Sequence, residues 1–413
     1  MLLAGVVAAV ACNVEESGVD TGGLGGALGM GGRAACPVAL AVLLSDYASS
    51  QVALVDPLGN TVSESLISTA SSRTDGLAFA LSGDVALPAT PQDSGLLVLL
   101  DRFGTNVVTF IDPYSGHVQH QLPIGTGFEA NPQDYVEVSG KGFVARFGQN
   151  THPGREAFDD GGDLLILDLG PPAIRGQILL PVWDDLPARP TALARIAGEL
   201  VVTLARISLD FRSTGHSALV GVSAEDEAIT FTHELDYKNC GRPTLSPDGE
   251  RFALACSGAL DTKGQVEAIE DSAILLFSAH SRPLELLDEL TATELGEGPL
   301  QSDVAFVDGD RLLVKTQTPI DGAQNNRLLA VDLQSRRATS LLEASQDDEG
   351  QGKGIVYGGL YCPGSCPGVC LLADADRNVL QRVDLSGDGD LELLTPLVVE
   401  RRVGLPPIAL SAL

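Results

Sequence analysis

Residues 106–125 read NVVTFIDPYSGHVQHQLPIG, and this stretch decides the fold class. A run of β-branched and aromatic residues, VVTFI, ends at Asp112 and is followed by the turn residues PYSG and by a second short run. This order predicts a strand, a tight turn and an antiparallel strand. No stretch of the 413-residue chain has a convincing helical period over about 12 residues. The sequence therefore predicts an all-β protein.

The same pattern recurs along the chain. Short apolar runs such as QVALVD, DLLILD and RLLAVD each end in Asp or Ser and lead into a turn. The residues that end these runs are Asp56, Asp112, Asp168, Ser223, Ser278, Asp332 and Asp384. Their spacing stays between 52 and 56 residues, which indicates seven copies of one structural unit.

A second pair of strands is predicted inside the units. Segments such as LAFALSGDVALPA (residues 77–89) and RPTLSPDGERFALAC (residues 242–256) read as strand, glycine-containing turn, strand. The turn glycines are Gly83, Gly140, Gly198, Gly249 and Gly309. Seven units of four strands predict a seven-bladed β-propeller of four-stranded antiparallel blades.

The two ends of the chain are predicted to share one blade. The C-terminal PIALSAL (residues 407–413) reads as an innermost strand, whereas the folded part begins near Cys36 with the second and third strands of a blade. The last strand should complete the first blade and close the ring, which removes two open sheet edges.

The repeats resemble the YVTN-type propeller family, which includes lactonase-like propellers and many exported bacterial proteins. The motifs that carry the resemblance are residues 106–125 and residues 242–256, and the repeat covers about residues 36–413. Ser223 and Ser278 stand where the other copies have Asp. The resemblance implies a propeller fold and almost nothing about function, because one fold hosts many activities.

The N-terminal residues predict export. Residues 2–11, LLAGVVAAVA, have the length of a signal-peptide core, and Ala9-Val10-Ala11-Cys12 resembles a bacterial lipobox with Ala9 where leucine is usual. We expect a signal peptide over residues 1–12 with lipid on Cys12, a Gly-rich tether over residues 13–35 and the propeller over residues 36–413. The alternatives are ordinary cleavage after Ala9-Val10-Ala11 and a buried N-terminal strand or helix.

Six cysteines remain after Cys12, and an even number in an exported chain suggests disulfides. Cys240 and Cys256 flank the turn at residues 246–249 almost symmetrically, so we expect them to bond across a hairpin. A second bond is expected from Cys36 to one of three cysteines in the seventh blade, for which Cys366 is a candidate. The three cysteines of the seventh blade are Cys362, Cys366 and Cys370. Free buried thiols and a metal site on CxxxCxxxC are the alternatives.

Charge excludes one class of partner. The chain has 26 Lys and Arg against 55 Asp and Glu, a formal net charge of -29, so it should repel nucleic acid. It has no run of 18 apolar residues, the length of a membrane-spanning helix. We therefore expect the lipid on Cys12 to hold the protein at the membrane.

An arginine recurs near the start of the innermost strand. The arginines at this place are Arg73, Arg189, Arg242 and Arg402. Together they could line the central channel and hold a carboxylate or phosphate. The alternative is that each pairs with an Asp of its own or the next blade.

The loops between the second and third strands are longer in blades 3 to 6, which suggests a binding surface on one face of the ring. Neutral variation of exposed loops would give the same pattern. His117 and His120 should point to opposite faces of a strand, and residues 384–390 lack the bidentate carboxylate of a calcium loop. The sequence contains no nucleophile elbow, P-loop or zinc motif, so no cofactor and no metal are predicted.

Three functions remain open. The first is a non-enzymatic, lipid-anchored propeller outside the cytoplasm that binds a protein, a glycan or a small anion on its long-loop face. The second is an exported lactonase-like hydrolase with an anion at the channel mouth, and the third is a structural element of a cell-surface complex. Side chains with strongly perturbed pKa values at the channel mouth would favour the hydrolase, whereas paired charges would favour binding.

Overall fold

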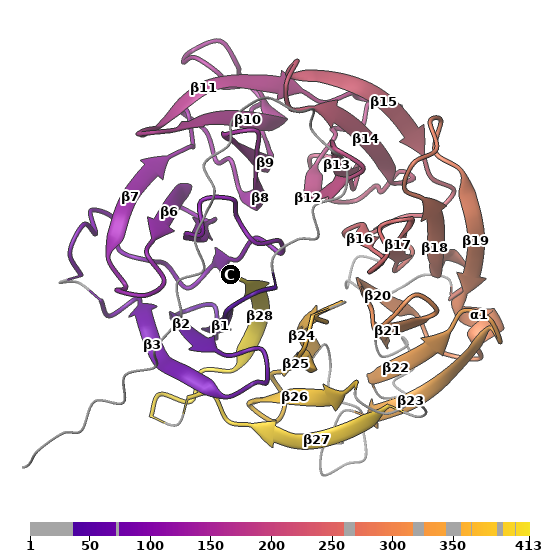
Figure 1. The fold of residues 1–413 in the computed structure, drawn as a ribbon. Coiled ribbons are helices and arrows are strands. Elements are labelled where there is room, and N and C mark those ends of the chain that lie inside the picture. Colours follow the sequence, from indigo (N-terminus) through magenta and orange to yellow (C-terminus); the bar gives the residue numbers. More distant parts are fainter. Residues whose placement is uncertain are drawn as a thin grey trace, which may run out of the picture. The chain divides into compact units, whose positions relative to one another are not determined.

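The computed structural model describes residues 36–71, 74–259, 269–316, 326–343, 357–364, 366–385, 391–400 and 402–413. Within them, 28 strands form seven four-stranded antiparallel sheets that stand as blades around a central axis (Figure 1). The predicted seven-bladed β-propeller is confirmed. We letter the strands of each blade a to d, from the axis outward.

The first four blades contain the described chain up to Glu234 together with the C-terminal strand. Blade 1 consists of β28 (Pro407–Ala412), β1 (Leu40–Ser45), β2 (Ser50–Val55) and β3 (Thr61–Ser68). Blade 2 consists of β4 (Val85–Ala86), β5 (Leu97–Asp101), β6 (Val107–Ile111) and β7 (Val118–Pro123). Blade 3 consists of β8 (Pro132–Val138), β9 (Lys141–Gln149), β10 (Gly161–Leu169) and β11 (Pro172–Leu179). Blade 4 consists of β12 (Pro190–Ile196), β13 (Glu199–Leu204), β14 (Ala218–Ser223) and β15 (Ala228–Glu234).

The last three blades follow in the same order. Blade 5 consists of β16 (Thr244–Leu245), β17 (Arg251–Cys256), β18 (Ala273–Ser278) and β19 (Leu286–Thr291). Blade 6 consists of β20 (Leu300–Phe306), β21 (Arg311–Thr316), β22 (Arg327–Asp332) and β23 (Arg337–Glu343). Blade 7 consists of β24 (Tyr357–Tyr361), β25 (Cys370–Asp374), β26 (Val379–Asp384) and β27 (Glu392–Leu397). Two short helices, η1 (Ile269–Asp271) and α1 (Ala292–Leu295), accompany blade 5.

The core lies between the blades. Strands b and c are buried along almost their whole length, as β13 and β14 illustrate, whereas the outermost strand β15 is largely exposed. The described residues form seven apolar clusters, one for each pair of neighbouring blades. Each blade therefore depends on both neighbours for burial of its apolar faces.

The ring closes as the sequence predicts. β28 pairs antiparallel with β1, from Leu40 opposite Ala412 to Leu44 opposite Pro407. The Leu413 N–H donates to the Ala39 carbonyl at 2.9 Å, which continues the ladder beyond the two strands. The C-terminus therefore supplies strand a of the blade whose other three strands come from the N-terminal part of the domain.

Three disulfides join cysteines of the described residues. Cys240 bonds Cys256 and Cys36 bonds Cys366, in line with the pairings expected from the sequence. The third disulfide, Cys362–Cys370, joins the remaining two cysteines of blade 7. Three disulfides are typical of an oxidising, extracytoplasmic environment.

The predicted hairpin around Gly83 is wrong. Strand a of blade 2 is β4, which begins after Gly83 and pairs with β5, so residues 87–96 form the a–b connection. Proline interrupts this segment at Pro88 and Pro91, and a residue without an N–H cannot continue a ladder. The expected hairpin therefore had the wrong centre.

Gly83 serves interblade packing instead. A Cβ on Gly83 would lie 2.3 Å from the carbonyl oxygen of Tyr47 in the b–c loop of blade 1. The Ser45 hydroxyl of that blade donates to the Gly83 carbonyl at 2.7 Å. Glycine is required here because two blades approach closely, and not because of a turn.

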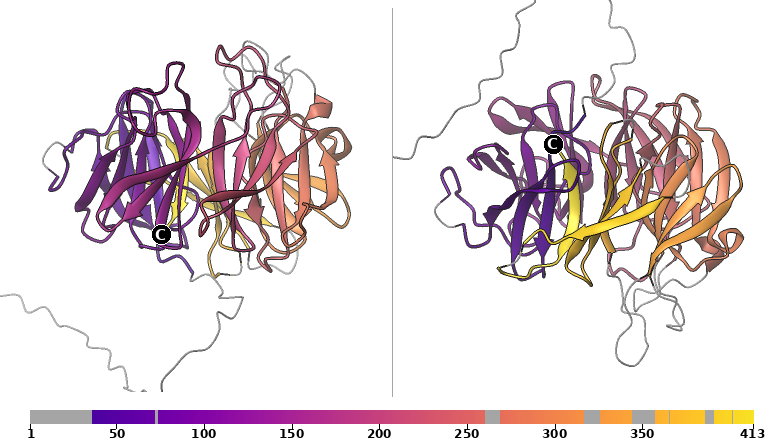
Figure 2. Two further views of the ribbon diagram at one scale, coloured as in Figure 1. Left: turned by 90° about the horizontal axis from the view of Figure 1, so that it is seen from above. Right: turned by 60° about the horizontal axis from the view of Figure 1, so that its bottom comes forward.

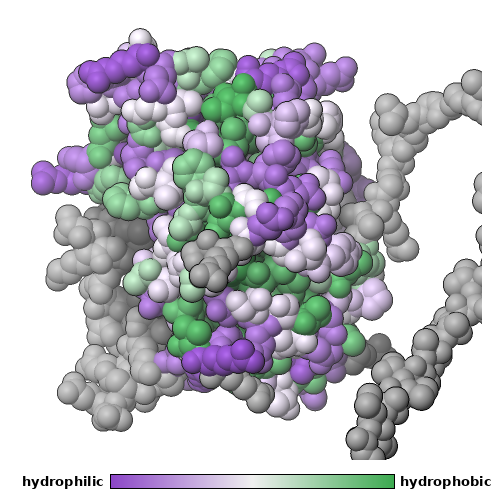
Figure 3. All heavy atoms as spheres, turned by 90° about the vertical axis from the view of Figure 1, so that its left-hand side faces the viewer, coloured by the Kyte–Doolittle hydropathy of each residue, from purple (hydrophilic) through white to green (hydrophobic). Residues whose placement is uncertain are grey.

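The loops lie at the two ends of the ring. In side view, the long connections from β9 to β10 and from β13 to β14, in magenta and rose, protrude at one end (Figure 2). On the side of the ring shown in Figure 3, hydrophobic and hydrophilic residues are interspersed. Among the described residues there is no helix long and apolar enough to cross a membrane.

Candidate functional site

A cavity of about 340 Å³ opens between blades 4, 5 and 6. Its walls come from the starts of strands a and the ends of strands b, so it lies at the end of the ring that carries the b–c and d–a loops. We call it the channel-mouth cavity. It is lined by Thr191, Ala192, Ala205, Ile207, Asn239, Cys240, Gly241, Arg242, Ser257, Ser302 and Asp303.

Arg242 is the cation of the cavity. Its Nη2 lies 2.9 Å and its Nε lies 3.3 Å from Oδ2 of Asp134 on β8. The same carboxylate, which is buried, also accepts the Leu193 N–H of β12 at 2.8 Å. One carboxylate of blade 3 thus holds the backbone of blade 4 and the guanidinium of blade 5, while a quarter of the Arg242 side chain (25%) stays exposed.

Asp303 is the anion of the cavity. Its Oδ2 lies 2.9 Å from Nζ of Lys315, a buried lysine that also donates to the Gly358 carbonyl of blade 7. Burial alone would raise the pKa of the Asp303 carboxyl, but Lys315, Arg242 and the N–H of Leu360 together lower it below its ordinary value of 3.8. At neutral pH the cavity therefore presents an ionised carboxylate whose charge is offset by neighbouring cations.

This pairing predicts a pH dependence of stability. Because the folded-state pKa of Asp303 is lowered, its contribution is complete above the ordinary pKa of 3.8 and is lost as the pH falls toward the folded-state value. Asp303→Asn should therefore be less stable than the parent protein at pH 7, and the difference should narrow below about pH 4. Urea unfolding of both proteins at pH 7, 5 and 3 measures the difference in their free energies of unfolding. A difference that grows on acidification would contradict the assignment.

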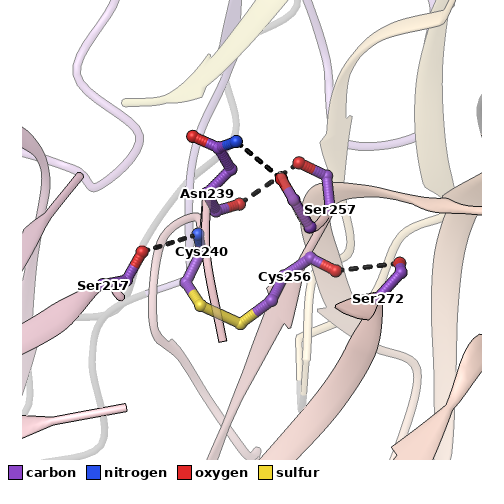
Figure 4. The surroundings of a disulfide bond; sticks show 7 residues. Ser217, Asn239, Cys240, Cys256, Ser257 and Ser272 are labelled. Atoms are coloured by element: carbon purple, nitrogen blue, oxygen red, sulfur yellow. Dashed lines mark hydrogen bonds between the residues drawn. A yellow bond between two sulfur atoms is a disulfide. The ribbon is translucent and has the colours of Figure 1, made fainter. Parts of the chain in front are cut away.

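The Cys240–Cys256 disulfide stiffens one wall of the cavity (Figure 4). The Cys240 N–H donates to Oγ of Ser217 in blade 4 at 3.1 Å, and Oγ of Ser272 donates to the Cys256 carbonyl at 2.9 Å. The segment that carries Arg242 is therefore held covalently on one side and by a neighbouring blade on the other.

Gly241 sets the distance between blades 5 and 6 at the cavity. A Cβ on this residue would lie 1.8 Å from the carbonyl oxygen of Ser302, a backbone atom that cannot rotate away. We expect Gly241→Ala to lower the free energy of unfolding by about 1–3 kcal/mol through this overlap. Gly309→Ala is the matched control, because the atom closest to its Cβ would be 3.9 Å away. Urea unfolding compares the two variants, and an equal loss in both would refute the steric explanation.

The other predicted channel arginines do not join Arg242. Arg189 is buried, and its guanidinium donates to the carbonyls of Phe147 and Ile207 at 3.2 Å each. Burial lowers the pKa of Arg189. Nε of Arg402 lies 3.7 Å from Glu64 on the outermost strand of blade 1, and its side chain is 86% exposed. Arg73 is outside the described residues.

Two buried arginines were missed in the sequence. Arg146 forms a fully buried ion pair with Asp163, and Arg206 is buried against Trp183 with its Cζ 5.1 Å from the ring centroid. Arg206 also pairs with Asp184 at 3.0 Å. Both arginines follow an alanine near the end of strand b in adjacent blades, so an Ala-Arg pair recurring in the repeat was the signal that could have identified them.

Other sequence predictions can be located only in part. Cys12, the tether and most of the calcium-like segment 384–390 lie outside the described residues. The long b–c loops of blades 3 and 4 are described, whereas residues 260–268 and 317–325 in the loops of blades 5 and 6 are not. Over the described ranges, no three His, Cys, Asp or Glu side chains converge as a metal-binding group.

No protein-family model and no curated protein matches the sequence. Solved structures match the fold. A provisional 6-phosphogluconolactonase of Bacteroides fragilis is 12% identical with a TM-score of 0.54, over 91% of this chain and 98% of that chain. A protein of unknown function from Desulfotomaculum acetoxidans is 12% identical with a TM-score of 0.51, over the same shares of 91% and 98%. Hydrazine synthase of Kuenenia stuttgartiensis is 12% identical with a TM-score of 0.51, over 75% of this chain and 79% of that chain. Likeness at this level of identity shows a common fold and nothing about the ligand.

Proposed function

We propose that this chain is an extracytoplasmic β-propeller that binds a small ligand in the channel-mouth cavity and serves as a binding module. The observation that carries the proposal is the pairing of the cavity charges, Arg242 with Asp134 and Asp303 with Lys315. Arg242 is held by a carboxylate of blade 3, and Asp303 is held by a lysine of its own blade that is also bonded to blade 7, so both groups are in place before a ligand arrives. Donors and acceptors that are already ordered bind a ligand with less loss of entropy.

The hydrolase alternative requires a side chain at the cavity that exchanges a proton near neutral pH. The pKa of Asp303 is lowered, so its carboxyl is ionised there and engaged with Lys315. This environment supports binding over proton transfer. Turnover of a lactone that disappears in Asp303→Asn would overturn the proposal in favour of the hydrolase.

A melting-temperature screen tests the binding function. We expect a ligand among sugars, lactones, small anions and divalent ions to raise the melting temperature. A ligand that binds only the folded state and is present at a concentration of about 100 times its Kd adds about 2.7 kcal/mol to the free energy of unfolding. Ser302→Trp, which places an indole at the cavity, should abolish the shift. A shift that persists in this variant would place the ligand elsewhere and refute the cavity as the site.

We also propose that a lipid on Cys12 attaches the protein to the membrane. The support is the apolar run before Cys12, the Gly-rich residues 13–35 and the three disulfides, which are typical of exported proteins. Mass spectrometry of the mature N-terminus should find diacylglyceryl-modified Cys12, and Cys12→Ser should move the protein from the membrane fraction to the soluble one. A mature chain that begins at another residue without lipid would refute the anchor.

A further inference from the structure

Phe211 is held in an unfavourable backbone conformation in the loop that also contains Ile207, a residue that lines the channel-mouth cavity. It lies in the β13–β14 connection with a φ of 60°, in the left-handed region that bulky side chains rarely adopt. Its N–H donates to the Ser208 carbonyl at 3.1 Å, and the Ser208 hydroxyl accepts the Ser213 N–H at 3.0 Å, so the loop itself is ordered. Strain of this kind persists where surrounding contacts enforce it, and it is concentrated at functional sites.

One face of the Phe211 ring is supported by the protein. Cζ of Arg189 lies 4.8 Å from its centroid, and the Phe147 ring stacks near it at 6.2 Å between centroids with an interplanar angle of 17°. Arg189 itself donates to the carbonyl of Phe147 on β9 and to the carbonyls of Ile207 and Ser208 in the β13–β14 connection. Phe211 is nevertheless 63% exposed, so the structure supports the ring from one side and presents the other side to solvent.

Arg189 connects the aromatic side chain of Phe211 with the wall of the cavity. Ile207 lines the cavity, and its carbonyl accepts the Nε–H of the same Arg189 that supports Phe211. The cavity is also lined by Ser302 and by three further polar side chains, Thr191, Ser257 and Asn239. The last three already donate to backbone carbonyls, so their side-chain oxygens remain as acceptors for a ligand. Arg189 therefore links the exposed aromatic side chain of Phe211 to a small polar cavity at the same end of the propeller.

The charges of the site indicate the class of ligand. The guanidinium of Arg242 is offset by Asp134 and the carboxylate of Asp303 by Lys315, so neither a lone anion nor a lone cation finds an uncompensated charge. The net charge of -29 on the whole chain also repels anions at a distance. What remains is a set of planar polar groups and hydroxyls suited to hydrogen bonds with a neutral molecule rich in hydroxyl groups.

We propose that this site binds a neutral saccharide, with one sugar ring stacked on the exposed face of Phe211 and the hydroxyls of the adjoining unit bonded to Arg242, Asp303 and Ser302. The inference rests on the proposed binding function and specifies its ligand. The cavity of about 340 Å³ is at the small end of ligand pockets. It therefore suits a terminal unit or a short segment of a glycan.

Calorimetric titration with neutral tetrasaccharides tests the inference, using those of glucose, xylose, mannose and N-acetylglucosamine. We expect at least one tetrasaccharide to bind the parent protein. Phe211→Gly should lower the affinity for it by about tenfold or more, which corresponds to about 1.4 kcal/mol. Glycine removes the ring and adopts the positive φ without strain, so the fold should be retained. Phe211→Trp, which keeps an aromatic face, should stay within about threefold of the parent.

Two further variants separate the contributions. Ser302→Ala should lower the affinity for the same saccharide several-fold, because it removes a hydroxyl that bonds the sugar. Tyr114→Ala should leave this affinity unchanged. Tyr114 is 85% exposed but lies in a c–d turn, at the end of the ring away from the cavity. Unchanged affinity in Phe211→Gly would overturn the inference.

Charged probes distinguish the failure of this inference from the failure of the proposed function. Glutamate, citrate and glycine betaine are titrated against the parent protein and Arg242→Lys. If these probes bind the parent protein more tightly than Arg242→Lys and no saccharide binds, the saccharide proposal is wrong and the proposed binding function is supported. If no saccharide, charged probe, lactone or divalent ion binds, both proposals are wrong.

Discussion

Arg146→Met is expected to lower the free energy of unfolding by about 3–5 kcal/mol, because it leaves the buried carboxylate of Asp163 without its partner. Both side chains are fully buried. Nε of Arg146 donates to Oδ1 of Asp163 at 2.7 Å, and the guanidinium also donates to the Thr126 hydroxyl and the Phe158 carbonyl at 2.7 Å each. A single side chain thus connects strand β10, the connection from blade 2 and the long loop of blade 3.

Urea unfolding followed by circular dichroism measures the effect of this substitution. Arg175→Met is the matched control, because Arg175 pairs with Glu227 at 3.0 Å but is 46% exposed, and a surface pair contributes only about 0–1 kcal/mol. The double variant Arg146→Met/Asp163→Leu should recover part of the loss, since no unpaired charge stays buried. A single variant as stable as the control would show that the pair contributes little.

Removal of the Cys36–Cys366 bond is expected to have the second large effect. The bond joins residues 330 positions apart, and the chain-entropy model gives about 6 kcal/mol for a loop of that size. The variant replaces both cysteines with serine, so that no free thiol can exchange with Cys362–Cys370. Unfolding in urea without reductant measures the loss.

The Cys362–Cys370 bond provides the comparison. It spans only 8 positions, for which the same model gives about 2.5 kcal/mol. The paired serine variant at these positions should therefore be less destabilised than the variant at Cys36 and Cys366. Equal losses would argue against loop closure as the origin of the stabilisation.

Much of the architecture was predictable because each repeat carries its own turn chemistry. Asp112 ends a strand c, and its carboxylate accepts the N–H groups of Tyr114 and Ser115 at 2.8 and 3.1 Å, which lowers its pKa. In blade 4 the Ser223 hydroxyl accepts the Asp226 N–H at 3.1 Å in the same place. The alternation of Asp and Ser along the repeat thus reflects one local interaction, and such interactions can be read from a short stretch of sequence.

The cavity was harder to predict because its contacts join distant residues. Arg242 and Asp134 are 108 positions apart and lie on blades that are not neighbours. The Arg-Pro-Thr motif is shared by Arg189 and Arg242, yet the first is buried against Phe147 while the second lines the cavity. A repeated motif predicts a position within a blade, but the side chains that contact this position come in part from other blades.

The position of Cys36 also has a mechanical consequence. This residue is the first of the folded part, and its sulfur is bonded to Cys366 of blade 7. A pulling force applied through the chain ahead of Cys36 would pass along that covalent bond into blade 7 before it could peel β1 away from β28. The joint that completes the propeller would then carry little of the load, and the propeller would stay closed under tension.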